Sequence, residues 1–457
     1  MPAKPESRLT CVSAESAFPG LQRSLGTIDS ALIIIGIVIG SGIFVLPNLI
    51  AQDLPSSAAI LAAWAVSGGL SYFGALAYAE LGVMMPETGG QYVYLREAYN
   101  ALTAFVCGWT FILAVLAGGT AFLAVTFSIY LGSFIHLAPL ASKCVSIALV
   151  LGLSAVNYVG VREGIWVQRV FTSLKIGGIL LLIVSAFFLP PITQPFSITP
   201  GISLSHFGAA MVACLMAYNG WTYISFVAGE IRDPHRNLPR ALALAMTVVI
   251  AIYLLANVAY LRVLSIHEIA ASDRVGAMLA TRTLGHSGPA ILSIIVLISI
   301  IGAINGCIIT GARIPFAQAR DGLFFAFLGR LHPRFHTPSA AILVQAVWAS
   351  VLLVSGSYAT LYSYTIVAAW IFYTMTVAAV FILRRKFPNA PRPYRMWGYP
   401  YTLIIFVTVS IWFIVNSFVT QPVPSCWALI IAGAGIPAYY IWRKSAKVSG
   451  LTPVGDQ

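Results

Sequence analysis

Charged residues are scarce in this chain, and their scarcity excludes a large soluble core. Asp, Glu, Lys and Arg make up 9% of its 457 residues and hydrophobic residues 59%, whereas a soluble domain has about 25% charged residues. A membrane-spanning helix needs about 20 mostly apolar residues. The length therefore leaves room for about a dozen such helices joined by short loops, and the composition indicates an integral membrane protein surrounded by lipid.

Paired cysteines and metal-ligand spacings are also missing. The six cysteines are scattered singly, without a CxxC motif, and we expect them to be reduced packing residues. An integral-membrane enzyme would need clusters of His, Cys or acidic residues near the membrane surface, and a channel would need a continuous polar stripe along several helices. The sequence has neither feature. No enzyme, channel, metal site or cofactor is therefore predicted.

Acidic residues are nearly absent from the apolar segments. Of fourteen, only Asp29, Glu80 and Glu230 fall within these segments or directly at their ends. No carboxylate is therefore placed to bind sodium or to relay protons at the centre of the membrane. We expect Glu80 and Glu230 to be structural, each pairing with nearby arginines on the inner side, where the pairs could form a gate.

Long apolar runs are abundant, and they predict an all-α integral membrane protein with twelve transmembrane helices. The predicted spans are residues 27–50, 57–84, 101–133, 141–160, 164–189, 204–229, 239–262, 288–318, 338–356, 358–383, 398–419 and 424–442. With the N-terminus inside, 21 Lys and Arg residues lie on the inner side and 4 on the outer side, as the positive-inside rule requires. We therefore expect a multi-pass protein of the cytoplasmic membrane with both termini cytoplasmic. The net charge of +12 then needs no nucleic-acid partner.

Two of the predicted spans contain weak points. The centre of span 1 reads IVIGSGIF at residues 37–44, and each glycine weakens a helix by about 1 kcal/mol relative to alanine. Span 6 carries Asn219 and Gly220, two residue types that tolerate unusual backbone angles. Span 6 lies five spans after span 1 and therefore crosses the membrane in the opposite direction. Two broken helices in this relation are typical of transporters built from inverted repeats. Close packing of neighbouring helices is the alternative explanation for the glycines.

Breaks at these positions would expose backbone groups that suit a small zwitterion. Free amides at the positive end of a half-helix can bind a carboxylate, and we expect those of Gly40, Ser41, Gly42 and Ile43 to do so. Unpaired carbonyls can bind an ammonium group, and we expect those of Val38, Ile39, Met216, Ala217 and Asn219 beside the break at Gly220. An α-amino acid fits one anion site beside one cation site.

Lys175 is an ionisable residue near the middle of span 5, in FTSLKIGGILLLI. It lies about 15 Å from either end of the helix, too deep for its side chain to reach water, and such residues are functional candidates. Its ammonium could bond the carbonyls of the span 1 break in place of a coupling cation, which predicts sodium independence. A desolvated lysine could instead carry a coupling proton, or be an inert group beside a water-filled crevice.

Six motifs together resemble the L-type amino acid transporters of the amino acid–polyamine–organocation superfamily, and the resemblance covers nearly the whole chain. The motifs are IVIGSGIFVLP (37–47), YAELGVMMPETGGQYVYLREAY (78–99), VQRVFTSLK (167–175), AYNGW (217–221), GEIRDPHRNLPRAL (229–242) and GAINGCIITGARIPFAQARDG (302–322).

The resemblance implies a LeuT-type fold. Two inverted five-helix repeats would occupy residues 27–189 and 204–383, and two further helices would occupy 398–442. Cytoplasmic tails would occupy residues 1–26 and 443–457. The family is similar in working mainly by obligatory exchange of neutral amino acids.

The resemblance also implies roles for individual residues. The substrate carboxylate would bind at Gly40, Ser41 and Gly42, and the amino group would bind the carbonyls before them and those of the span 6 break. Lys175 would lie where sodium-coupled relatives hold sodium. We also consider Trp221 and Asn305 as coupling or gating residues. The candidates for side-chain selectivity are Met216, Trp221, Asn305, Tyr358 and Tyr362.

Two departures from the family pattern affect these expectations. Met216 stands where the family usually has an aromatic gate, and a flexible thioether covers a site less rigidly. The loop GSFIHLAPLASK between spans 3 and 4 lacks the cysteine by which animal members bond a single-span glycoprotein, and Cys144 only begins span 4. The chain thus resembles a bacterial member without a disulfide-linked heavy subunit. Exchange of small neutral amino acids and proton-coupled symport through Lys175 both stay open.

Overall fold

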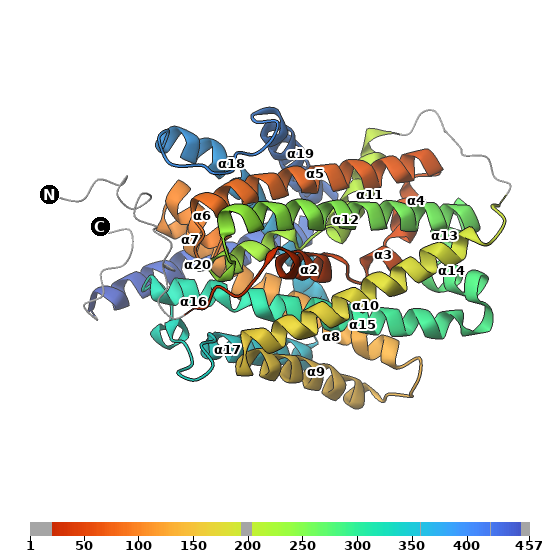
Figure 1. Cartoon of the computed structure of the whole chain (residues 1–457), viewed down its shortest axis with the longest axis horizontal. Coiled ribbons are helices and arrows are strands. Elements are labelled where there is room, and N and C mark those ends of the chain that lie inside the picture. The colour runs from red at the N-terminus through yellow and green to blue at the C-terminus, as the bar shows by residue number, and fades with distance from the viewer. Residues whose placement is uncertain (1–20, 193–202, 357, 421, 449–457) are drawn as a thin grey trace.

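The described part of the computed structural model covers residues 21–192, 203–356, 358–420 and 422–448, and its regular structure is helical (Figure 1). Eight of the predicted spans are single helices: α5 (Ser57–Met84), α9 (Pro139–Val159), α10 (Val161–Phe187), α12 (Pro234–Val263), α17 (Ser339–Ser355), α18 (Tyr358–Lys386), α19 (Tyr401–Thr420) and α20 (Pro422–Val448). Each lies within a few residues of its predicted bounds, because a helix surrounded by lipid must satisfy all its backbone groups internally.

The other predicted spans are interrupted. Span 1 consists of α2 (Thr27–Val38), α3 (Gly42–Val45) and α4 (Pro47–Asp53); span 3 of α7 (Ala101–Thr110), the π-helix η1 (Phe111–Leu116) and α8 (Ala117–Leu131); span 6 of α11 (Leu204–Ala217) and the 3₁₀-helix η2 (Trp221–Glu230); and span 8 of α15 (Gly288–Gly311) and α16 (Arg313–Arg320). The interruptions in spans 1 and 6 coincide with the two weak points in the sequence.

Several short helices lie between the spans and were not predicted. They are α6 (Gln91–Ala98), α13 (Ile266–Ala271), α14 (Val275–Leu284), η3 (Gly285–Ser287) and η4 (Ala326–Gly329). The start of α13 carries a recognisable signal, since Ser265 and Glu268 form a reciprocal capping box. The hydropathy pattern finds long apolar segments and passes over helices of this length.

Ten helical segments of the described residues are long and apolar enough to cross a membrane, with the interrupted segments Ala101–Leu131, Leu204–Glu230 and Val275–Arg320 each counted once, and Thr27–Val38 and Ser339–Ser355 are shorter apolar helices. The chain is therefore a multi-pass membrane protein, while the count of twelve crossings and the division into two five-helix repeats stay predictions. The predicted tails fall largely outside the described residues, at 1–20 and 449–457.

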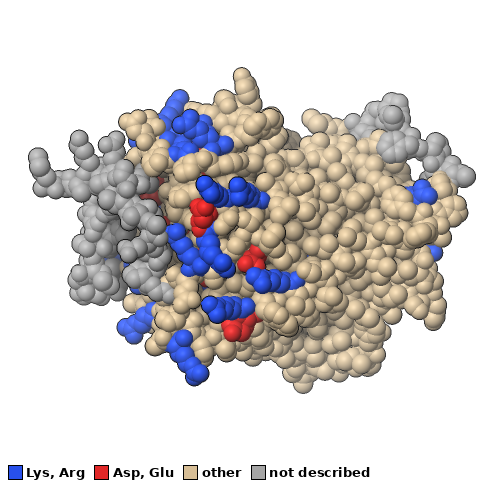
Figure 2. Space-filling view, viewed as in Figure 1, with Lys and Arg blue, Asp and Glu red and all other residues tan. Residues whose placement is uncertain are grey.

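The interrupted first span lies inside the bundle. In Figure 1, α2 is seen in the middle of the molecule, and it packs against α10, α12 and α15. Lys and Arg side chains gather at the end of the molecule that carries α6, α16 and α20, and few lie at the opposite end (Figure 2). Between the two ends the visible surface has almost no charged residues, as contact with lipid requires.

Candidate functional site

The first break separates α2 from α3. The helix ends at Val38, the chain turns at Ile39 (φ −78°, ψ 86°), and helix resumes at Gly42. The turn brings the Gly40 amide to 2.9 Å from the Val38 carbonyl, to which it donates. The expectation that the Gly40 amide is free is therefore wrong, because an inverse γ-turn forms here and uses it. Among the described residues, no backbone carbonyl accepts a hydrogen bond from the amides of residues 41–43.

The second break separates α11 from η2. Gly220 has φ +120°, a backbone conformation that only glycine adopts readily. A Cβ atom at this position would lie 2.6 Å from Cγ2 of Ile37 and 3.4 Å from the amide nitrogen of Val38. The turn of span 6 is thus packed directly against span 1, immediately before the first break.

A cavity of about 250 Å³ lies between the two breaks. This volume is close to the lower end of the range for small-molecule sites and suits a single amino acid better than a peptide. Most of the backbone residues predicted for substrate binding line it: Val38, Gly40, Ser41, Gly42, Met216, Ala217, Asn219 and Gly220. Ile39 does not line the cavity, because its side chain is buried on the other side of the turn and its carbonyl bonds elsewhere.

Helix α8 and its neighbours also line the cavity, and the sequence did not single these residues out. They are Val115, Gly119, Phe122, Leu123 and Thr126 on one face of η1 and α8, with Tyr223 from η2 and Cys307 from α15. Their spacing of three and four residues does mark one face of a helix. In a span that is apolar on every side, however, the hydropathy pattern cannot tell the cavity face from the lipid face.

Lys175 lies directly behind the first break. Its side chain is fully buried, and Nζ donates to the Gly36 carbonyl at 2.7 Å and to the Ile39 carbonyl at 2.5 Å. Oγ of Ser299 donates to the same Ile39 carbonyl at 3.0 Å. These carbonyls lose their helical partners where α2 ends, and the lysine and the serine supply new ones. The Ile39 carbonyl thus faces Lys175 and not the cavity.

Two tyrosines form hydrogen bonds with the broken helices through their uncharged hydroxyl groups. The hydroxyl of Tyr253 on α12 lies 2.9 Å from the Val38 carbonyl and 3.1 Å from the Ala217 carbonyl, so it can donate to either. The hydroxyl of Tyr373 donates to Oδ1 of Asn219 at 3.0 Å. Tyr253 therefore bridges the two broken helices through the carbonyls that were expected to meet an ammonium group.

Two predicted coupling or gating residues lie outside the cavity lining. Trp221 is buried, with its ring 5.1 Å from that of Tyr78 and 5.9 Å from that of Tyr373. Asn305 belongs to a buried network, in which Nδ2 donates to Oε1 of Gln168 at 2.9 Å and Oδ1 accepts from Asn157 at 2.8 Å.

Two further candidates for side-chain selectivity, Tyr358 and Tyr362, have side chains outside the described part of the structure.

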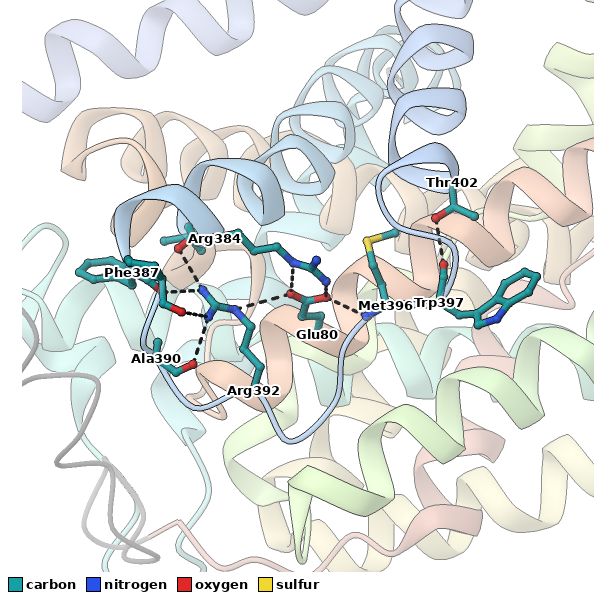
Figure 3. Close-up of polar contacts among 10 residues, drawn as sticks. Glu80, Arg384, Phe387, Ala390, Arg392, Met396, Trp397 and Thr402 are labelled. Atoms are coloured by element: carbon teal, nitrogen blue, oxygen red, sulfur yellow. Dashed lines mark hydrogen bonds and ion pairs between the residues drawn. The ribbon is translucent and has the colours of Figure 1, made fainter.

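Glu80 anchors the loop between α18 and α19. Its fully buried carboxylate accepts from Arg384 at 2.8 and 2.7 Å and from the Met396 amide at 2.7 Å, and it lies 3.8 Å from Nε of Arg392 (Figure 3). Arg392 in turn donates to carbonyls of its own loop, including that of Phe387 at 2.7 Å. The glutamate therefore ties α5 to the strongly basic end of α18.

Further ion pairs join other helices at the same end of the bundle. Glu230 accepts from Arg313 at 2.8 and 2.9 Å, with both side chains buried. Nη1 of Arg96 lies 2.5 Å from Asp321. Glu80 and Glu230 thus pair with arginines, as the sequence led us to expect, and none of these charged residues lines the cavity between the breaks.

Metal ligation finds no support among the described residues, where His, Cys, Asp and Glu side chains do not come together in groups of three. The cysteines of this part of the chain are free, and Cys11 lies outside it. The two breaks therefore offer backbone groups, hydroxyls and, behind the first break, one ammonium group, which are means of binding a polar molecule.

Comparison with known proteins gives a consistent result. Residues 25–439 match the family model described as amino acid permease. The chain is 32% identical over 428 residues to the serine/threonine exchanger SteT of Bacillus subtilis, covering 93% of this chain and 98% of that protein. It is 30% identical to the human b(0,+)-type amino acid transporter 1, covering 91% and 87%. It is 32% identical to the human large neutral amino acids transporter small subunit 2, covering 93% and 82%.

Proposed function

This chain belongs to the amino acid permease family, whose members are transporters and not enzymes, and from that premise we propose that it is a sodium-independent exchanger of small neutral L-amino acids. One observation carries the proposal: two broken helices meet at a cavity of about 250 Å³. The chain transports amino acids across a membrane, and the proposal adds the substrate class, the coupling and the binding mode.

The carboxylate of the substrate binds the amides of residues 41–43 in this proposal. These amides begin the outer half of span 1 and are free of backbone partners among the described residues, so they suit an anion. The amino group binds near the Val38 and Ala217 carbonyls, each of which has a second lone pair beside its contact with Tyr253. Gly40, Gly42 and Gly220 keep the backbone within reach of the ligand.

Sodium independence rests on the position of Lys175. Its ammonium already contacts the carbonyls of Gly36 and Ile39, which is what a coupling cation would otherwise do. A second monovalent cation at this point would meet both the charge of the lysine and the loss of its carbonyl ligands. We therefore expect the lysine to make sodium unnecessary at the first break.

The substrate class follows from the cavity lining and from a relative. Thr126, Tyr223 and Cys307 add polar or polarisable groups to an otherwise apolar lining, and the SteT protein is named as a serine/threonine exchanger. Small neutral and hydroxyl-bearing amino acids fit such a site, while a charged side chain would lie there without a partner.

The transport cycle is proposed to be alternating access in a LeuT-type fold with twelve spans and two inverted repeats. The ion pairs of Glu80, Glu230 and Arg96 join helices at the end that carries the arginines, which supports an inner gate that is closed in this conformation. The positive-inside rule supports a cytoplasmic location for that end and for both predicted tails. No disulfide-linked heavy subunit is expected, since residues 132–143 hold no cysteine.

Counterflow in proteoliposomes tests the proposal. The full-length protein is reconstituted into vesicles that contain unlabelled L-serine or no amino acid, and uptake of labelled L-serine is measured in sodium or choline buffer. We expect rapid uptake only into loaded vesicles, equal in both buffers. A panel of threonine, alanine, leucine, phenylalanine, glutamate and lysine inside the vesicles then defines the substrate class.

An inward pH gradient across empty vesicles separates the two mechanisms. Uptake driven by this gradient, equal to that into loaded vesicles, would establish proton-coupled symport through Lys175 in place of exchange. A requirement for sodium would contradict the role given to the lysine.

A further inference from the structure

A second cavity, which shares no lining residue with the substrate site, lies at the arginine-rich end of the bundle. Its volume is about 580 Å³, and guanidinium groups of Arg23, Arg162, Arg169 and Arg232 line it together with the Asp29 carboxylate. Four positive groups and one negative group leave a net charge of +3. We call this cavity the basic pocket.

Two of its arginines have partners within the pocket. Nε of Arg169 donates to Asp29 at 2.6 Å, and Nη2 of Arg232 donates to the Ser24 carbonyl at 2.7 Å. Arg23 and Arg162 form no ion pair with the described residues, and the Nε atom of Arg23 is buried without a hydrogen-bond partner there. A buried guanidinium nitrogen without a partner calls for an acceptor, and two unpaired guanidiniums at one cavity call for an anion.

The surroundings of the basic pocket connect it to the lipid-facing surface. Trp166, which also lines the pocket, is 63% exposed, and Leu174, two turns further along α10, is 52% exposed. Tryptophan favours the boundary between headgroups and hydrocarbon. A smaller cavity of about 220 Å³ shares Arg162 and adds Arg334 and one carboxylate, that of Glu163, so two arginines and one acid line the neighbouring surface.

We propose that the basic pocket binds the phosphate group of an anionic membrane phospholipid, with its acyl chains lying along the exposed face of α10. The phosphate accepts hydrogen bonds from Arg23 and Arg162, the two groups without partners. A cavity of this size holds far more than one water-sized group of about 30 Å³, which favours a glycerophosphate headgroup over a free phosphate ion. This site goes beyond the proposed exchange function and does not depend on it.

The position of the pocket gives the lipid a structural effect. Leu25, next to Arg23 and Ser24 in the chain, pairs with Ile231 through backbone hydrogen bonds: its carbonyl accepts from the Arg232 amide at 2.9 Å. This contact joins the inner start of span 1 to the inner end of span 6. A phosphate held by Arg23 and by Arg162 at the start of α10 ties α10 to the segment that makes this contact, so we expect the bound lipid to stabilise the inner side of the bundle.

Native mass spectrometry of the purified full-length protein tests the site. The protein is titrated with phosphatidylglycerol or with zwitterionic phosphatidylcholine of the same acyl chains. We expect preferential retention of phosphatidylglycerol, weakened about fivefold for each arginine removed, and so about 25-fold in the double variant Arg23→Gln/Arg162→Gln. Arg330→Gln, at an exposed arginine outside both cavities, is the matched control and keeps wild-type retention.

Further arms separate charge, fold and ligand source. Arg162→Lys keeps the charge and should keep retention within about threefold of wild type, and the single variant Arg162→Gln at this exposed position serves if the double variant does not fold. Inorganic phosphate at matched concentration should not raise the melting temperature, whereas phosphatidylglycerol should. A stabilisation by inorganic phosphate equal to that by the lipid would overturn the lipid as source. Equal retention of both lipids, or unchanged retention in the double variant, would show an ordinary solvated basic face and end the proposal. None of these measurements uses transport.

Discussion

The breaks in spans 1 and 6 are satisfied by different chemistry. At the first break a charged group, the Lys175 ammonium, donates hydrogen bonds to the carbonyls of Gly36 and Ile39. At the second break the contacts are neutral: Tyr253 reaches the Ala217 carbonyl and Tyr373 reaches the Asn219 side chain. Hydrogen bonds with an ionised partner contribute about 1.5–3 kcal/mol, and neutral ones about half as much.

The backbone conformation is more restricted at the second break than at the first. Gly220 has φ +120° and no space for a Cβ atom, whereas a Cβ at Gly40 would meet no atom within 4 Å. The first break is thus fixed by a side chain from another helix and the second by its own glycine. This contrast teaches that a helix in lipid can be interrupted in two ways, by a distant donor or by a local conformation.

Lys175→Ala should have the largest effect. It removes both charged hydrogen bonds, leaves the buried Gly36 carbonyl without this donor and leaves the Ile39 carbonyl with Ser299 alone, so we expect exchange of labelled L-serine in proteoliposomes to fall about 100-fold. Ser299→Ala, which removes only a neutral donor from the same Ile39 carbonyl, is the control and should lower exchange about fivefold at most. If the lysine variant exchanged L-serine at the wild-type rate, the charged group would not be needed at the first break.

Gly220→Ala should come next, through the fold of the protein. A side chain at this backbone conformation and 2.6 Å from Ile37 should cost about 2–4 kcal/mol, seen as a lower melting temperature and loss of monodisperse protein in detergent. Gly40→Ala is the matched control, and its melting temperature should stay near that of the wild type while the concentration for half-maximal exchange rises. If the two variants had equal melting temperatures, the second break would not depend on its glycine.

Tyr253→Phe should have an intermediate effect, because it breaks the contact between the two helices. Loss of one neutral hydrogen bond to a buried carbonyl costs about 1–2 kcal/mol, and we expect exchange to slow about tenfold while the protein stays folded. Tyr260→Phe, which removes a single contact to the Ile43 carbonyl at 3.1 Å, provides the comparison on the same helix. If both variants lost the same amount of exchange activity, the contact of Tyr253 with both broken helices would not be the reason for the loss.

Cys307→Ser should have the smallest effect on its own, within about threefold of wild-type exchange, because the two side chains are similar in size. The cysteine lines the cavity, so a small thiol reagent that reaches it should slow exchange, and saturating L-serine should protect against the reagent. The serine variant should be insensitive. Inhibition without protection would place Cys307 outside the substrate path.

The first-break prediction shows how far a local pattern carries. Glycines in an apolar run correctly predicted that the helix is interrupted, since helix propensity is a local property. The pattern could not say that Ile39 forms an inverse γ-turn that uses the Gly40 amide. Several turns are compatible with the same three residues, and packing against Gly220 and Lys175 selects among them.

The residues that line the cavity could not be identified from the sequence pattern. Phe122 and Thr126 lie on an apolar helix whose every face is compatible with lipid, so no periodicity marks the side that faces the cavity. Asn305 carried a polar signal at membrane depth, and the structure places it in a network with Gln168 and Asn157. A polar residue at that depth must have hydrogen-bond partners, but the sequence does not show which residues they are.

Hydropathy and backbone propensity are properties of short segments, and for that reason the order of residues was enough to fix residence in the membrane, the ends of most helices, the two interruptions and the uneven distribution of arginines. Partners in space are a property of the folded bundle. Lys175 meets a carbonyl 139 residues away, Tyr253 one 215 residues away, and Arg384 a carboxylate 304 residues away. Those pairings, the side of α8 that faces the cavity and the gathering of four arginines around Asp29 arise only when the helices pack, because each group accepts whichever complementary partner the packing brings within reach.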